Sequence, residues 1–314
     1  MSLIFTIDDL ISQFDDTEQG TEEWKRLTEN SIGGSSCSIV IGENQYMSSS
    51  ELLNQMLKKT KRAEGNLRPC FHGQICEAIH VALFTEMLKC KIGIVGFYKF
   101  SEQKHFSADA VAILSDGSIV LFEFKTPYSR RPAKTPGSIK PEYKCQIQYS
   151  MGGFPFDYTL FSEVMVLYDR GDFNNSIRAT EFKNMGRFEL HVRCDEIPGT
   201  YHFDDLNTAQ IDILCRNFIK TDYIKLELNH HACSDLRAVR SRLGLTGDSI
   251  SQTIVLGEPG HGNIIVTGYF GPWYVHKVYP NKNKIAEINR GVDTFLKCLN
   301  NYSNVSREKD NADP

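Results

Sequence analysis

Hydrophobic and polar residues alternate along the chain with two periodicities, one typical of helices and one typical of strands. Apolar residues spaced three and four apart in segment 73–91 form one stripe and predict an amphipathic helix. β-Branched and aromatic runs on both sides of Ser115-Asp116-Gly117 predict a β-hairpin within segment 106–127. Further helices are predicted at 7–16, from Thr21 to a break at Gly33-Gly34, and at 48–59, 140–154, 206–220 and 284–302. Strands are predicted at 162–169, 187–194 and 273–280, with shorter ones within 251–271.

This order of elements is typical of a mixed sheet with helices packed on its faces. The length of 314 residues suits one large α/β (α+β) domain. We expect its core at about 20–168 and 266–300, an insertion at about 170–265, and a disordered tail at 303–314.

The composition is that of a globular protein, with 41% hydrophobic and 24% charged residues. No apolar run approaches the roughly 18 residues that would span a bilayer, so no membrane partner is expected. The nine cysteines form no CxxC pair, which favours free thiols in a reducing compartment. An intracellular location, cytoplasmic or nuclear, is therefore expected.

The charge is unevenly distributed. The net charge is −4, but residues 58–144 hold 15 lysines and arginines against 8 acids, a balance of +7. Such a local field can attract a polyanion even in an acidic protein. The basic runs KKTKR, with Arg62, and SRRPAK, with Arg130 and Arg131, are candidate phosphate contacts. A solvated charged face is the alternative.

The hairpin carries charges where an apolar strand should have none. If Gly117 closes a three-residue loop in the left-handed conformation, Leu114 pairs with Ser118 and Asp109 falls opposite Glu123. Opposed residues have Cβ atoms about 5 Å apart, at which two carboxylates repel unless a cation lies between them. Lys125 projects from the same face as Glu123. Carboxylate ligands favour Mg²⁺ or Mn²⁺, whereas a salt-bridged strand edge is the structural alternative.

Four segments in order resemble the phage lambda-type exonucleases, the YqaJ viral recombinase family of the PD-(D/E)XK nuclease superfamily. They are EEWKRLTENSIGGSS, HGQICEAIHVALF, FSADAVAILSDGSIVLFEFKTPYSRR and KPEYKCQIQYSM. The resemblance covers about residues 20–155 and implies a restriction-endonuclease-like core, a mixed central sheet flanked by helices.

The resemblance also implies roles at matching positions. Asp109, Glu123, Glu77 and the Phe124 carbonyl would bind two Mg²⁺ or Mn²⁺ ions, and Lys125 would be the catalytic lysine. Ser35, Ser107 and Gln146 would bind substrate phosphates, with Tyr149 supporting the same face. The implied activity is a 5′→3′ exonuclease on double-stranded DNA ends, with a single-strand annealing protein as a further partner and either a ring trimer or a monomer as the assembly.

One departure from the family pattern concerns recognition of the DNA end. The family usually has a phosphate-gripping arginine seven residues before the serine that matches Ser35, and here that position is Thr28. Arg62, Arg130 or Arg131 could replace it. An endonuclease, a nuclease acting on DNA and RNA, and a non-catalytic nucleic-acid-binding protein therefore stay as alternatives.

Three weaker signals have ordinary structural explanations. Trp24 and His80 are expected to pack in the core. HVRC and HHAC offer zinc-ligand types at irregular spacing, for which packing is favoured: His191, Cys194, His230, His231 and Cys233.

Overall fold

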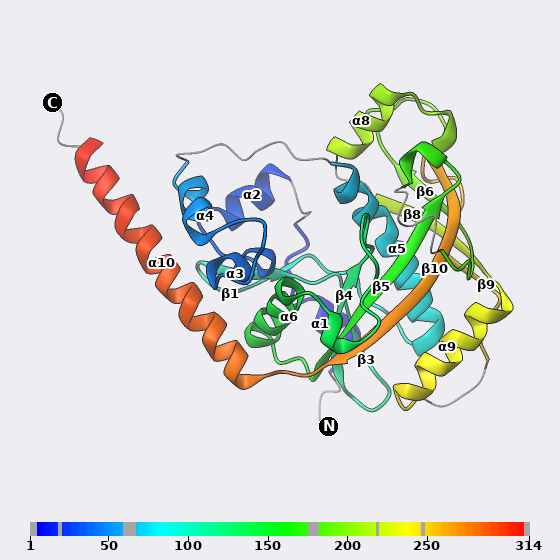
Figure 1. Cartoon of the computed structure of the whole chain (residues 1–314), viewed down its shortest axis with the longest axis horizontal. Coiled ribbons are helices and arrows are strands. Elements are labelled where there is room, and N and C mark those ends of the chain that lie inside the picture. The colour runs from blue at the N-terminus through cyan, green and yellow to red at the C-terminus, as the bar shows by residue number, and fades with distance from the viewer. Residues whose placement is uncertain are drawn as a thin grey trace.

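A curled mixed sheet runs through the protein, with helices on both of its faces (Figure 1). The computed structural model describes residues 5–17, 21–58, 67–174, 182–217, 220–245 and 249–310, with 303–310 described by their backbone alone. Within these residues the sheet has eight strands. Along it lie β3 (Ala110–Ile113), β4 (Ile119–Lys125), β5 (Tyr158–Tyr168), β10 (Ile264–Val278), β6 (Gly186–Arg193), β8 (Lys220–Leu228) and β9 (Thr253–Gly257), while β7 (Tyr201–His202) pairs with β10. The prediction of a mixed sheet flanked by helices is confirmed.

The predicted hairpin register is confirmed. β3 and β4 pair antiparallel, with Ala110 opposite Phe122 and Ile113 opposite Ile119. The Leu114 amide donates to the Ser118 carbonyl at 3.0 Å, and Gly117 has φ +84°, a conformation that costs glycine least. β4 then pairs in parallel with β5, so the hairpin is fixed to the centre of the sheet.

Segment 170–265 belongs to the same sheet as the predicted core. β6 pairs antiparallel with β10, and β8 and β9 continue the sheet beyond it. α8 (Thr208–Arg216) and α9 (His230–Arg242) accompany these strands. The predicted insertion therefore widens the central sheet.

β10 corrects the prediction of separate strands on either side of residue 271. It is one strand of 15 residues, and its pairing with β5 shifts register between Phe270 and Trp273. Gly271 and Pro272 lie at this shift. Because proline cannot donate to a ladder, the irregularity lets the strand continue past it.

The helices divide between the two faces of the sheet. α5 (Arg68–Leu88) covers one face together with α8 and α9. α6 (Pro141–Gly153) packs on the other face of the sheet, and the remaining helices and a small two-stranded sheet lie on the same side as α6. These are α1 (Ile7–Ile11), α2 (Glu22–Thr28), α3 (Gly34–Val40), α4 (Ser49–Met56), α10 (Lys282–Asp310), β1 (Phe97–Ser101) and β2 (Lys104–Ser107).

Alternation along β4 creates two separate cores. Val120, Phe122 and Phe124 point to the α5 side, whereas Leu121 belongs to the core on the α6 side. Glu123 and Lys125 continue the Leu121 series, so both charged side chains belong to the α6 face.

Several predicted boundaries need correction. α1 ends at Ile11 rather than near 16. α2 ends at Thr28, before Gly33-Gly34 as predicted, but the helix α3 that begins at Gly34 was not predicted. β1, β2, β8 and α9 were not predicted. The tail predicted to be disordered from 303 has helical backbone as far as Asp310, and 311–314 lie outside the described residues. No helix of the described part of the chain is long and apolar enough to cross a membrane.

Candidate active site

Glu123 and Lys125 form the centre of the candidate site, at the end of β4. Glu123 is buried, with 1% of its surface exposed. Its Oε1 forms an ion pair with Nζ of Lys125, which keeps 23% of its side chain exposed. The same Oε1 makes no well-formed hydrogen bond to another described residue. A buried carboxylate with so few donors is costly unless a cation compensates it.

Asp109 lies just before β3, where the confirmed register brings it beside the end of β4. Its Oδ2 accepts a hydrogen bond of 2.5 Å from the Phe124 amide. The hairpin register thus places Asp109 of one arm beside Glu123 of the other, as predicted, and the Phe124 amide of β4 holds the Asp109 carboxylate.

Glu77 reaches the site from α5, and a buried histidine fixes the helix that carries it. His80, one turn after Glu77, lies 2.7 Å from the Ser162 hydroxyl through Nδ1 and 3.1 Å from the Thr126 hydroxyl through Nε2. Its ring stacks on Phe124 at 4.9 Å. His80 is therefore a core residue, as expected, and it sets the rotation of α5 that presents Glu77.

The three acids are electrostatic neighbours. Burial raises the pKa of Asp109, and it raises that of Glu123 to about 7 with repulsion from Asp109 adding to the shift. The Glu77 side chain is exposed, yet the loss of hydration in the site raises its pKa well above the usual value, and repulsion from Asp109 and Glu123 adds to the shift. Lys125 opposes all three shifts. One ammonium therefore faces more negative charge than it can neutralise.

Lys125 stays protonated in this environment. Burial alone would lower its pKa, but the attraction of Glu123 and Asp109 outweighs burial and the net shift is upward. Burial and the nearby ammonium of Lys125 lower the pKa of His80 to about 3. His80 is therefore neutral at physiological pH and acts through its hydrogen bonds.

The donor set of the site suits a hard divalent cation. Its acids are oxygen donors, their raised pKa values report uncompensated negative charge, and Glu123 Oε1 is buried with few donors. Among the described residues, however, no three His, Cys, Asp or Glu side chains lie close enough together to hold a metal ion. Metal binding by Asp109, Glu123, Glu77 and the Phe124 carbonyl therefore stays a prediction. The zinc alternative gains no support, since its ligands do not form such a group either.

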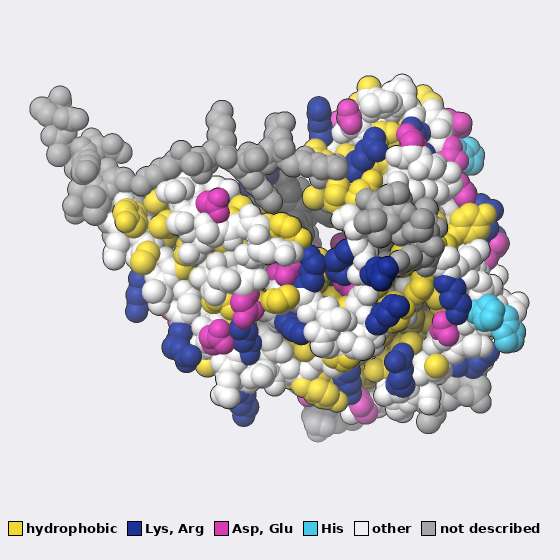
Figure 2. Space-filling view, viewed as in Figure 1, with side chains coloured by type: hydrophobic (Ala, Val, Ile, Leu, Met, Phe, Trp, Pro, Cys, Tyr) yellow, Lys and Arg dark blue, Asp and Glu magenta, His cyan; other side chains and the backbone are white. Residues whose placement is uncertain are grey.

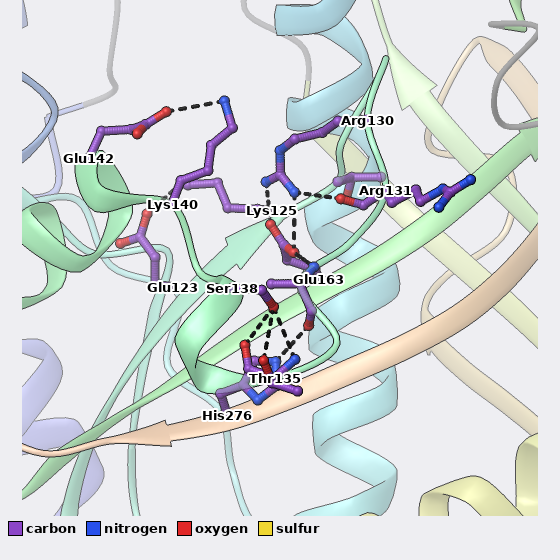
Figure 3. Close-up of polar contacts among 12 residues, drawn as sticks. Glu123, Lys125, Arg130, Arg131, Thr135, Ser138, Lys140, Glu142, Glu163 and His276 are labelled. Atoms are coloured by element: carbon purple, nitrogen blue, oxygen red, sulfur yellow. Dashed lines mark hydrogen bonds and ion pairs between the residues drawn. The ribbon is translucent and has the colours of Figure 1, made fainter. Parts of the chain in front are cut away.

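Arg130 is held by an acid that the sequence analysis missed. Glu163 on β5 pairs with Lys125 across the parallel ladder and is 1% exposed. Its carboxylate forms an ion pair with Arg130 and accepts a hydrogen bond from the Ala133 amide (Figure 3). The Ala133 carbonyl lies 2.7 Å from Nε2 of His276. The loop after β4 is thus fastened to the sheet at two strands.

Tyr143 on α6 brings the two cations of the site together, and its role was also missed. Nζ of Lys125 and Cζ of Arg130 each lie 5.4 Å from the centre of its ring. Phe161 lies 6.0 Å from the same ring and supports it from the sheet. Cations this close to an aromatic ring are stabilised by it.

The predicted phosphate-binding residues differ in their placement. Ser35 is exposed on α3, and Ser107 and Gln146 are half-buried at the end of β2 and on α6. A Cβ at Gly34 would lie 3.3 Å from Cγ of Gln146, so Ser35 and Gln146 come from helices in close contact. Arg131 is exposed beside Arg130. Their contacts with phosphate stay predictions.

The remaining predicted residues are Tyr149, Thr28 and Arg62. Tyr149, predicted to support the phosphate-binding face and to take part in DNA binding, is a core residue: it is 1% exposed and its hydroxyl donates to the Ile32 carbonyl at 2.8 Å. Thr28 ends α2, and its hydroxyl donates to the Trp24 carbonyl at 2.8 Å. Arg62 lies outside the described residues.

The surface around the site is hollowed and basic. In Figure 2, lysine and arginine side chains gather around a hollow in the middle of the molecule, with acidic side chains deeper within it. Such an arrangement attracts a polyanion to its rim and a cation to its floor.

Comparison with known proteins agrees with this picture. The fold and site define a mixed α/β protein with an acid–lysine cluster at the rim of its sheet. Residues 23–152 match the family model of the YqaJ-like viral recombinase domain. This match confirms the predicted resemblance to the YqaJ viral recombinase family over that segment.

Solved structures with a similar fold include three nucleases. The alkaline exonuclease LHK-Exo of Laribacter hongkongensis is 15% identical, with 92% of this chain and 97% of that chain covered and a TM-score of 0.47. A phage-related exonuclease of Haemophilus somnus 129PT is 11% identical, covering 88% and 96%, with a TM-score of 0.46. The Shutoff and Exonuclease Protein of Kaposi's sarcoma-associated herpesvirus is 12% identical, covering 93% and 72%, with a TM-score of 0.33. No curated protein sequence matches the chain.

Proposed function

We propose that the protein is a Mg²⁺-dependent deoxyribonuclease, a 5′→3′ exonuclease that acts on double-stranded DNA ends. The family match supports a nuclease. The observation that carries the proposal is the cluster itself: three acids with raised pKa values share one ammonium within a basic hollow.

The chain's own residues have separate tasks in this reaction. Asp109, Glu123 and Glu77 would hold one or two Mg²⁺ or Mn²⁺ ions, with the Phe124 carbonyl as a further ligand. When bound, the ions would supply positive charge to the phosphate and acidify a water molecule. Lys125 keeps its proton, so it orients the attacking water and stabilises charge on the phosphate. Ser35, Ser107, Gln146 and Arg131 would hold the phosphates of the strand.

The placement of Arg130 and Thr28 favours a second candidate, an endonuclease. Thr28 stands where the family has its phosphate-gripping arginine, and Arg130 is already paired with Glu163. Recognition of a 5′-phosphate therefore lacks its usual cation at that position. DNA is the partner in either case, and the single-strand annealing protein implied by the family is a further proposed partner.

One experiment separates these candidates. End-labelled linear DNA and covalently closed circular DNA are incubated with the wild type, Lys125→Ala and Lys225→Ala, with and without Mg²⁺. Lys225 lies on β8, away from the site, and serves as the control. The expected result is Mg²⁺-dependent loss of the linear DNA alone, abolished in Lys125→Ala and unchanged in Lys225→Ala. Cleavage of the circle would replace the exonuclease by the endonuclease, and full activity of Lys125→Ala would refute both.

A further inference from the structure

Tyr46 is an exposed aromatic residue held in a fixed position. At 73%, its exposed fraction is the highest among the large hydrophobic residues of the described chain. The amides of Tyr46 and Met47 donate to Oδ1 of Asn44 at 2.8 and 3.1 Å, which fixes the turn between α3 and α4. Its hydroxyl accepts a hydrogen bond of 3.0 Å from Nζ of Lys140. The ring is thus restrained at both ends while its surface stays open to solvent.

A short chain of contacts connects Tyr46 to the active site. Lys140 immediately precedes α6 and forms an ion pair of 3.1 Å with Glu142 (Figure 3). Tyr143, in the first turn of α6, has its ring 5.4 Å from Nζ of Lys125. The first turn of α6 therefore joins the exposed ring on one side to the catalytic lysine on the other.

An exposed ring beside a lysine matches the chemistry of an unpaired nucleotide. Bases of a duplex are already stacked on their neighbours, whereas an unpaired base has a free face that an aromatic side chain can cover. The lysine meets the phosphate of the same strand. Glu142 neutralises part of the Lys140 charge, so the ring rather than the ammonium carries most of the expected affinity.

We propose that Tyr46 and Lys140 form a stacking site for an unpaired base of the nucleic-acid strand that approaches the active site. This site rests on the proposed function, because it serves the same substrate. It adds a preference for a single-stranded or frayed segment next to the scissile phosphate, which the acid–lysine cluster by itself does not specify.

Tyr279 offers a matched control. It is 60% exposed and has Nζ of Lys277 at 5.2 Å from its ring, so it too is an open tyrosine beside a lysine. It follows the end of β10 that pairs with the start of β5, whereas the active site lies at the end of β4. Tyr279→Ala therefore removes a similar side chain from the opposite end of these strands.

The test measures binding of a fluorescent oligothymidylate in EDTA, where no hydrolysis is expected. Tyr46→Ala should weaken binding about fivefold or more, the loss expected for one stacked base. Tyr46→Phe keeps the ring and should stay within about twofold of the wild type, as should Tyr279→Ala. Lys140→Ala should reduce the slope of log affinity against log salt by about one, with the slope of Tyr46→Ala unchanged.

A second probe is a relaxed, covalently closed circular duplex, which has no unpaired bases and to which Tyr46→Ala should bind within about twofold of the wild type. If Tyr46→Ala bound oligothymidylate as tightly as the wild type does, the proposed stacking site would be refuted. An equal loss of affinity for the closed circular duplex, or a Tyr46→Phe variant that binds as weakly as Tyr46→Ala, would refute it too. A wild-type protein that binds neither probe would instead refute the proposed function itself.

Discussion

Replacing Glu163 by glutamine tests whether the acid missed in the sequence organises the loop beside the active site. Oε1 of the carboxylate accepts a hydrogen bond from Arg130, and Oε2 accepts one from the Ala133 amide and a longer one of 3.4 Å from Arg130. Glutamine has the same shape as glutamate but only one oxygen, so its NH₂ group would face either Arg130 or the Ala133 amide, both of which are donors. One buried donor then loses its partner, at a cost of about 1–3 kcal/mol, and a charge-assisted bond is weakened as well.

The expected loss in free energy of unfolding is about 2–4 kcal/mol. This loss is smaller than the largest losses caused by breaking buried ion pairs, because Arg130 has 25% of its side chain exposed and can regain some hydration. Urea unfolding followed by circular dichroism measures it. Glu227→Gln on β8 is the control: its partner Lys225 is 37% exposed and Glu227 itself 54%, so a change within about 0.5 kcal/mol is expected.

A double-mutant cycle with Arg130→Gln isolates the pair. If the two side chains stabilise the loop together, their effects are not additive, and a coupling of about 1–3 kcal/mol is expected. The Glu163→Gln variant should also show a raised KM for DNA, because the loop carries Arg131 next to the site. Additive effects, or a Glu163→Gln variant as stable as the wild type, would refute the reasoning.

Three further predictions concern the site and its support. Burial raises the pKa of the Glu123 carboxyl to about 7, and the proposed metal site needs that carboxyl ionised, so activity at limiting Mg²⁺ should rise about tenfold from pH 6 to pH 8; a flat profile would contradict this. His80→Ala removes a buried ring and its bond to Ser162, so urea unfolding should show a loss of about 2–4 kcal/mol, and an unchanged midpoint would count against its anchoring role. Tyr149→Phe should cost about 1 kcal/mol through the unpaired Ile32 carbonyl and leave DNA affinity unchanged; weakened binding would restore Tyr149 as a DNA contact.

The hairpin was predictable because local chemistry determines it. A three-residue turn with a left-handed glycine fixes the register, and the register fixes which acids meet. The prediction therefore placed Asp109 beside the end of β4 without any tertiary information. Glu77 followed from the family resemblance, and the His80 contacts that orient it were not readable from the helix alone.

Other features depend on contacts between distant segments. Glu163 stands in an apolar strand just as Glu123 does, and this signal could have identified it, but nothing near it in sequence points to Arg130. Gly33-Gly34 correctly predicted a break after α2 because glycine disfavours helices, but it gave no sign that α3 begins at Gly34, where α3 packs closely on α6. Tyr149 lies one turn from Gln146, and the sequence alone could not tell which of them faces the core.

Binding of Mn²⁺ to the protein tests the central claim most directly, because it depends on the acids and not on turnover. Isothermal titration compares the wild type with Asp109→Asn, a variant of the same shape without the charge, and with Asp169→Asn, whose acid pairs with Arg187 elsewhere on the sheet. The account predicts Mn²⁺ binding by the wild type and Asp169→Asn, and a loss of about tenfold or more in Asp109→Asn. Equal affinity in all three proteins, or no binding by the wild type, would contradict it.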